Sequence, residues 1–189
     1  MTIESPPSNL EATRVQTTPT SPSRCRWYQP TLSRHHGLVS TLLVVQHTPS
    51  PAVQEMLEAV LRGTRHPEVS GVTVEVRAAL SAGPADVLAA DGVILGTPAN
   101  IGYMSGALKH FLDQVYYPCL EVTVGLPYGV YVHGNDDTSG ALRGIHKIAG
   151  GMSWKQVAAD VSLVGAPNKE GLTACEELGA SLALQVAGY

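Results

Sequence analysis

The residues best suited to chemistry lie in three polar loops, and each loop directly follows an apolar run of the chain. The first loop, residues 46–52, reads Gln-His-Thr-Pro-Ser-Pro-Ala and carries no Lys or Arg. Pro is typical of the first turn of a helix, and a helix N-terminus binds phosphate through its unpaired N–H groups and its dipole. We therefore predict contacts to a phosphate from His47, Thr48, Ser50, Pro51 and Ala52. An ordinary Ser cap followed by Pro explains the same pattern without any ligand.

The second loop reads Gly-Thr-Pro-Ala-Asn-Ile-Gly-Tyr-Met-Ser over residues 96–105. Pro98 restricts the backbone, and Gly102 permits close approach of the backbone to a bound group. So long a connection with Gly and Pro at the end of a strand usually has a function, which disfavours an unspecialised β-to-α connection. The residues predicted to bind there are Thr97, Pro98, Ala99, Asn100, Ile101, Gly102 and Tyr103.

The third loop, residues 133–140, reads His-Gly-Asn-Asp-Asp-Thr-Ser-Gly. Its predicted binding residues are His133, Gly134, Asn135 and Thr138. Simple capping of the next helix by Asp137, Thr138 or Ser139 is the alternative. No catalytic side chain can be assigned from the sequence, and Tyr103 and His133 are the two candidates.

The elements that must position these loops alternate between strand and helix. Apolar runs predict strands over residues 38–45, 72–76, 91–96, 128–133 and 157–164. Apolar positions at helical spacing predict helices after each of them, for example at Val53, Met56, Leu57, Val60 and Leu61. Five strands joined by helices predict an α/β domain with a parallel sheet, helices on both faces and a ligand site at the carboxyl ends of the strands. Periodicity leaves the strand orders 2-1-3-4-5 and 3-2-1-4-5 both open.

Composition divides the chain into a tail over residues 1–37 and a domain over residues 38–189. The tail is rich in Ser, Thr and Pro with sparse apolar residues, so we predict disorder there. The formal net charge of the whole chain is -4, which argues against binding to nucleic acid. No apolar run approaches the length of a membrane span, and the N-terminus lacks the apolar segment of a secretory signal. The three cysteines form no Cys-x-x-Cys pair, so we expect a reduced, cytoplasmic setting.

Specific residues of the second loop and the helix after it resemble one known family. The stretch from Gly96 to Asp113 is similar to the Gly-Thr-Pro-x-x-x-Gly-x-Met-Ser…Lys-x-Phe-Leu-Asp pattern of the flavodoxin-like, FMN-binding NAD(P)H:quinone reductases and related FMN reductases. The resemblance covers residues 42–140 well, the last strand and helix loosely, and the tail not at all. It departs from flavodoxins proper in the first loop, where Pro49 and Pro51 stand in place of a Thr-rich phosphate loop.

The resemblance implies a flavodoxin-like fold with strand order 2-1-3-4-5 and one bound FMN. It implies that the second loop lies along the isoalloxazine ring and that the third loop contacts the ring as well. It implies further that NAD(P)H is the electron donor, that a quinone or similar small molecule is the acceptor, and that the protein forms homo-oligomers. A flavodoxin-type electron carrier without reductase activity stays open as the alternative, as does a scaffold that has lost its flavin.

Other chemistries are less well supported by the residues. His47 and His133 both end strands, but no third metal ligand of suitable spacing is evident, so we predict no metal site. A nucleotide fingerprint is lacking because the chain contains no Gly-x-Gly and no Gly-Lys-Ser/Thr. Tyr103-Met104-Ser105-Gly106 lacks the first Gly of the hydrolase elbow Gly-x-Ser-x-Gly.

Overall fold

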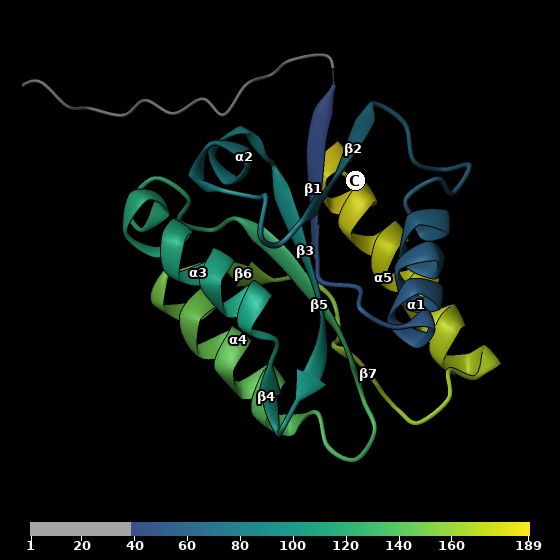
Figure 1. The fold of residues 1–189 in the computed structure, drawn as a ribbon. Coiled ribbons are helices and arrows are strands. Elements are labelled where there is room, and N and C mark those ends of the chain that lie inside the picture. The colour runs from purple at the N-terminus through teal and green to yellow at the C-terminus, as the bar shows by residue number, and fades with distance from the viewer. Residues whose placement is uncertain (1–38) are drawn as a thin grey trace, which may run out of the picture. The chain divides into compact units, whose positions relative to one another are not determined.

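The structure is a computed structural model that describes residues 39–189, so the predicted tail lies outside the described residues. The strands are β1 (Ser40–Gln46), β2 (Val72–Ala78), β3 (Gly92–Asn100), β4 (Tyr103–Met104), β5 (Pro127–Gly134), β6 (Lys155–Gln156) and β7 (Val161–Val164). The helices are α1 (Pro51–Gly63), α2 (Pro84–Ala89), α3 (Gly106–Cys119), α4 (Ser139–Gly151) and α5 (Lys169–Ala187). The alternation of strands and helices that the sequence predicts is therefore present (Figure 1).

The sheet is parallel apart from one short hairpin. Its order is β2-β1-β3-β5-β6, with β7 also paired to β5 and β4 paired to β3. The fourth predicted strand is β5, and β6 and β7 together take the place of the fifth. The order 2-1-3-4-5 that the resemblance implied is confirmed, and the order 3-2-1-4-5 is wrong for this chain.

The third and fifth predicted strands differ most from the structure, whereas the boundaries of the other three shift by two residues or fewer. The third strand does not end at Gly96 but continues to Asn100 and returns as β4, where Ala99 pairs antiparallel with Met104. The fifth strand does not run unbroken over residues 157–164 but is divided into β6 and β7, both against β5. Asp160, between them, accepts hydrogen bonds from Gln156 and His146 at 2.9 and 2.7 Å. These polar contacts hold the intervening segment against α4 and the end of β6.

Helices cover both faces of the sheet, with α1 and α5 on one face and α2, α3 and α4 on the other (Figure 1). The alternation along β1 explains the two cores. Leu42 and Val44 are buried against α1 and α5, whereas Leu43 and Val45 are buried on the opposite face. Since both faces are covered, the four successive residues 42–45 of β1 are all apolar, as expected for an internal parallel strand. No helix within residues 39–189 has the length and apolar character needed to cross a membrane.

Candidate functional site

A cleft of about 310 Å³ lies where the first, second and third loops meet at the carboxyl edge of the sheet. It is lined by Pro49, Ser50, Pro51, Ala52, Pro98, Ala99, Asn100, His133, Gly134 and Asn135. The loops meet because β1, β3 and β5 are parallel neighbours, so their carboxyl ends lie side by side. The cleft is therefore at the position where ligands bind in doubly wound sheets.

The first loop brings the N-terminus of α1 to this cleft. Ser50 is the N-cap residue, and its hydroxyl accepts a hydrogen bond from the Val53 N–H at 3.5 Å. Pro51 has no N–H, which leaves the Ala52 N–H as the free donor of the first turn. No Lys or Arg lines the cleft, so the positive end of the helix dipole is what would attract an anion there.

His47 and Thr48 do not line the cleft. The Thr48 hydroxyl donates to the side-chain oxygen of Gln46, so it is already engaged within the loop. The backbone N–H of His47 donates to the Gly96 carbonyl at 3.0 Å. The Nδ1 atom of its ring is buried without a hydrogen-bond partner among the described residues. These two residues fix the path of the loop at the end of β1.

The second loop is a tight hairpin between β3 and β4. Ile101 and Gly102 have φ angles of 50° and 71°, the positive values that a two-residue type I′ turn requires. Gly102 adopts this conformation readily, whereas a β-branched residue such as Ile101 is strained in it. Ile101 is also fully exposed. The strained, apolar tip therefore projects beside the cleft.

Buried hydroxyl groups close the base of this hairpin. The Thr97 hydroxyl accepts from the Ser105 N–H at 3.1 Å and lies 3.0 Å from the Ser105 hydroxyl. Ser105 in turn caps α3 by accepting from the Leu108 N–H at 3.2 Å. Thr97 is completely buried, so it positions the hairpin and does not line the cleft.

The third loop presents His133, whose side chain is buried at the side of the cleft. Its Nε2 donates to the Gly165 carbonyl at 2.7 Å, which leaves Nδ1 as the ring nitrogen able to accept or, when protonated, to donate. Thr138 is nearly buried and pairs with the Ser162 hydroxyl at 2.5 Å. Thr138 therefore anchors the loop to β7 and does not line the cleft.

The structure thus gathers nine of the predicted binding residues around one cleft and places the others nearby. Gly102 and Tyr103 line a second hollow on the far side of the hairpin. Sequence reasoning missed Pro49, which lines the cleft, and Gly165, which holds His133. Gly165 directly follows β7 at the same edge of the sheet, so its place at the end of the last strand is the signal that could have identified it.

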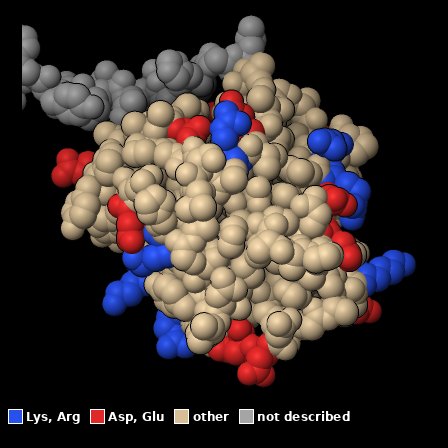
Figure 2. Space-filling model, in the orientation of Figure 1, with Lys and Arg blue, Asp and Glu red and all other residues tan. Residues whose placement is uncertain are grey.

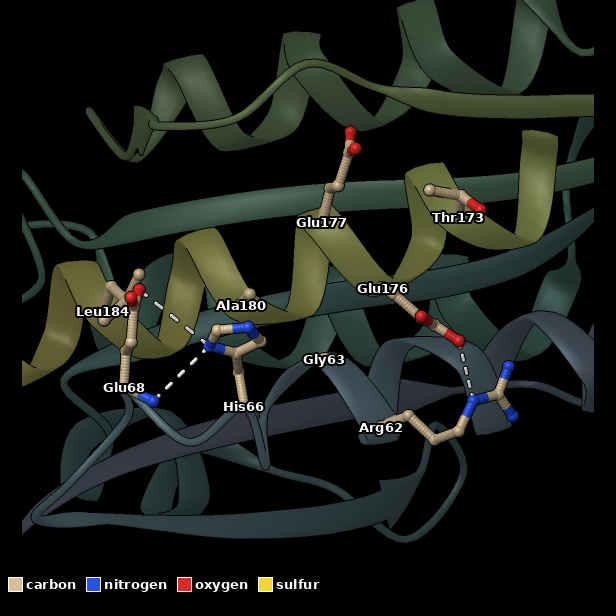
Figure 3. Close-up of a pocket in the computed structure, with 9 residues that line it drawn as sticks. All are labelled: Arg62, Gly63, His66, Glu68, Thr173, Glu176, Glu177, Ala180 and Leu184. Atoms are coloured by element: carbon tan, nitrogen blue, oxygen red, sulfur yellow. Dashed lines mark hydrogen bonds and ion pairs between the residues drawn. The ribbon is translucent and has the colours of Figure 1, made fainter.

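A further hollow of about 290 Å³ lies between α1 and α5 (Figure 3). Four of its polar side chains lie in pairs: Arg62 Nε lies 2.7 Å from Glu176, and His66 Nδ1 lies 3.9 Å from Glu68. Glu177 points away from these pairs (Figure 3). The hollow contains none of the predicted site residues, and its exposed ion pairs are typical of a solvated helix surface.

Comparison with known proteins supports the fold. No protein-family model matches the chain. A curated NAD(P)H dehydrogenase (quinone) from Acidithiobacillus ferrooxidans is 34% identical over 40% of this chain and 47% of its own length. A flavodoxin from Aquifex aeolicus is 36% identical over 39% of each chain. The chain therefore matches less than half the length of these curated relatives.

Solved structures match over nearly their whole length. A WrbA-like flavodoxin from Agrobacterium tumefaciens superposes with a TM-score of 0.64 at 21% identity, covering 78% of this chain and 98% of its own. A flavodoxin from the domain Archaea gives 0.67 at 17% identity, covering 78% and 99%. The parallel sheet covered by helices agrees with these likenesses, and the chain has the flavodoxin-like fold.

Proposed function

We propose that this protein is an FMN-dependent oxidoreductase that transfers hydride from NAD(P)H to a quinone or a similar small acceptor. The observation that carries the proposal is the cleft of about 310 Å³ that three loops form around the N-terminus of α1. The curated relative named NAD(P)H dehydrogenase (quinone) supports the same activity.

The residues around α1 fit the phosphate of FMN. Ser50 and the Ala52 N–H offer donors at the positive end of the helix dipole, which suits a single phosphate group. Pro49 and Pro51 hold this segment in a restricted backbone conformation. We expect Ser50 and Ala52 to bind the phosphate directly, and Thr48 to bind it only if its hydroxyl releases Gln46.

The other two loops fit a flat ring. Pro98, Ala99 and Asn100 form one wall of the cleft, and His133, Gly134 and Asn135 form another. Small or backbone-rich walls of this kind allow a ring system to lie against main-chain N–H groups. When bound, FMN would supply the two-electron chemistry between donor and acceptor. His133 would orient the ring or hold a proton at Nδ1. Tyr103 lines the hollow on the far side of the hairpin, so it would contact only a substrate that extends beyond the cleft.

The open cleft also predicts the kinetic mechanism. Donor and acceptor would have to reach the same exposed face of the cleft, so they cannot be bound together. We therefore expect ping-pong kinetics, seen as parallel double-reciprocal lines against NAD(P)H and quinone. Intersecting lines would instead require a ternary complex and separate places for the two substrates.

A flavodoxin-type electron carrier is the second candidate. The curated flavodoxin relative supports it, and so do the exposed carboxylates of Asp136 and Asp137 beside the cleft. Carriers dock through acidic faces, but Arg143 and Lys147 line the same hollow as Asp137 and reduce the negative charge there. This mixed charge favours the reductase.

Spectroscopy and assay separate the candidates. The purified protein, supplied with FMN, should show a flavin absorption spectrum and release FMN on heating, as identified by chromatography. It should then oxidise NAD(P)H when a benzoquinone is added. Binding of FMN without NAD(P)H oxidation would support the carrier, and failure to bind FMN at micromolar concentration would refute both.

A further inference from the structure

A second hollow of about 390 Å³ opens on the other side of the β3–β4 hairpin. Its lining includes Gly102 and Tyr103 from the hairpin, Asp137 and Ser139 from the third loop, and Arg143 and Lys147 from α4. Figure 2 shows basic side chains at the lower left, over the region that Figure 1 labels α3 and α4, with acidic side chains near them.

The β3–β4 hairpin and the third loop separate this hollow from the cleft. In the hairpin, Asn100 lines the cleft and Gly102 lines the hollow. In the third loop, Asn135 lines the cleft and Asp137 lines the hollow. Two residues of chain span at most about 7 Å. A ligand of dinucleotide length that enters the cleft can therefore extend across the hairpin into the hollow.

The net charge of the side chains that line the hollow suits an anion. Arg143 and Lys147 stand four residues apart, on one face of α4. Neither forms an ion pair within the part of the chain that the structure describes. Asp137 is the one carboxylate in the lining, so the formal charge there is about +1.

Asp137 is already engaged with its neighbour. Its carboxylate accepts from the Ser139 N–H at 2.9 Å and from the Ser139 hydroxyl at 2.7 Å. These hydrogen bonds, together with the nearby charge of Arg143, hold the pKa of Asp137 below its usual value. The carboxylate therefore binds its own loop and leaves the two cations available to a ligand.

The end of α4 adds backbone donors to these cations. Thr138 is the N-cap residue but makes no side-chain cap bond. The Ser139 N–H is engaged by Asp137, so the donors left in the first turn are the N–H groups of Gly140 and Ala141. Gly140 and Gly144 let the hairpin lie directly on the helix: a Cβ at Gly144 would come within 2.6 Å of the Tyr103 ring. The Tyr103 ring thus lies across α4 at the edge of the hollow.

We propose that this hollow binds a phosphate group of the nicotinamide dinucleotide donor, through Arg143, Lys147 and the N-terminus of α4. The inference rests on the proposed function, because it assumes that the nicotinamide end reaches the cleft. Phosphate is present in both the pyrophosphate of NADH and the 2′-phosphate of NADPH, so either group meets the chemistry of the site.

Titration calorimetry with redox-inactive fragments tests the site directly on the FMN-loaded full chain. ADP, 2′,5′-ADP and adenosine are the probes. The site predicts that at least one phosphorylated probe binds tenfold or more tighter than adenosine, with an affinity that falls as salt is raised. A tenfold advantage of 2′,5′-ADP over ADP would assign the 2′-phosphate, and a tenfold advantage of ADP would assign the pyrophosphate. Equal affinities would assign the 5′-phosphate that both probes carry. Equal binding of adenosine and both phosphorylated probes would overturn the proposal.

Matched double variants assign the binding to these cations. Arg143→Gln/Lys147→Gln should weaken the phosphorylated probes at least tenfold while leaving FMN affinity unchanged. Arg65→Gln/Lys155→Gln removes the same charge from exposed positions near the opposite edge of the sheet and should have less than a twofold effect. Equal loss in the two double variants, or none in the first, would refute the site.

Steady-state assays separate failure of the site from failure of the proposed function. NAD(P)H oxidation with an unchanged KM in Arg143→Gln/Lys147→Gln would leave the reductase standing and overturn the phosphate site. Selective fragment binding without any NAD(P)H oxidation would support the site and count against the reductase.

Discussion

At the scale of single residues, the Tyr131 ring packs directly against the backbone of Gly96 beneath the site. The two residues are register partners on β3 and β5, and a Cβ at Gly96 would lie 2.0 Å from the Tyr131 ring. Tyr131 is fully buried, and its hydroxyl has no hydrogen-bond partner among the described residues. The ring can lie over the neighbouring strand β3 only because residue 96 has no side chain.

We expect Gly96→Ala to lower the free energy of unfolding by about 2 kcal/mol or more, because a buried ring must move. Gly106→Ala is the matched control. Gly106 is the first residue of α3, and nothing lies within 4 Å of the added Cβ, so this variant should be equally stable or slightly more stable. Urea unfolding of both variants measures the difference. Equal stability of the two would contradict the predicted crowding.

The Cys175 thiol gives a prediction about pH. Burial, and secondarily the charge of Glu176, raises the pKa of Cys175 to about 12 from 9.0. The folded state therefore favours the protonated thiol, so its contribution to stability is complete below pH 9 and is lost as pH rises towards 12. Burial also raises the pKa of Tyr128 and of Cys119, which adds to the alkaline loss.

Cys175→Ala should reduce the steepness of this alkaline loss by up to about 1.4 kcal/mol per pH unit. The loss of packing by the smaller side chain changes the free energy of unfolding by the same amount at every pH. The slope of that free energy against pH therefore reports the thiol titration alone. Urea unfolding at several pH values from 8 to 10.5 measures it. If plots of the free energy of unfolding against pH are parallel for the variant and the original protein, Cys175 does not control the alkaline loss of stability.

At the scale of elements, α4 supports the hairpin that borders both the cleft and the hollow. A Cβ at Gly140 would lie 2.0 Å from the Gly102 carbonyl oxygen. We expect Gly140→Ala to push the hairpin outward and to weaken FMN binding at least tenfold, since the hairpin forms one wall of the cleft. Fluorescence titration with FMN measures this change.

Gly150→Ala provides a control within the same helix, because nothing lies within 4 Å of its added Cβ. It should leave FMN affinity unchanged and stabilise the helix by about 0.5–1 kcal/mol. Circular dichroism should show that both variants stay folded. Weakening of FMN binding by both variants would point to a general effect of α4 and not to the hairpin contact.

At the scale of the whole molecule, we expect a two-fold dimer in which each protomer helps to cover the other's cleft. Ile101 is fully exposed at the hairpin tip, and Tyr103 and Val164 near the same edge are 40% and 53% exposed. Closed two-fold pairs are the commonest oligomers, and an apolar tip is more stable when covered.

Light scattering should therefore give a dimer mass at assay concentrations. Ile101→Asp should shift it towards monomer, and Asp suits the positive φ better than Ile does. Val39→Asp changes another exposed apolar residue, 55% exposed and just before β1, and should leave the mass unchanged. A monomeric original protein would disprove the expectation and strengthen the carrier alternative.

The sequence by itself determined the order of strands and helices and the three loops that meet at the cleft. Both are local properties: apolar runs such as 42–45 require burial on two faces, and Ser50 with Pro51 before an amphipathic segment favours the start of a helix. The resemblance added the strand order, which periodicity had left open. Nine of the predicted contact residues line the cleft for this reason.

Only the tertiary structure decided what each loop residue does. Thr97 and Thr138 resemble ligand donors in the sequence, yet their hydroxyls bind Ser105 and Ser162, which lie 8 and 24 residues away. Nothing in the local sequence reveals such partners, because they depend on which strands become neighbours. The same holds for the hollow, where Arg143 and Lys147 stand beside Tyr103 only because Gly140 and Gly144 let the hairpin lie on α4.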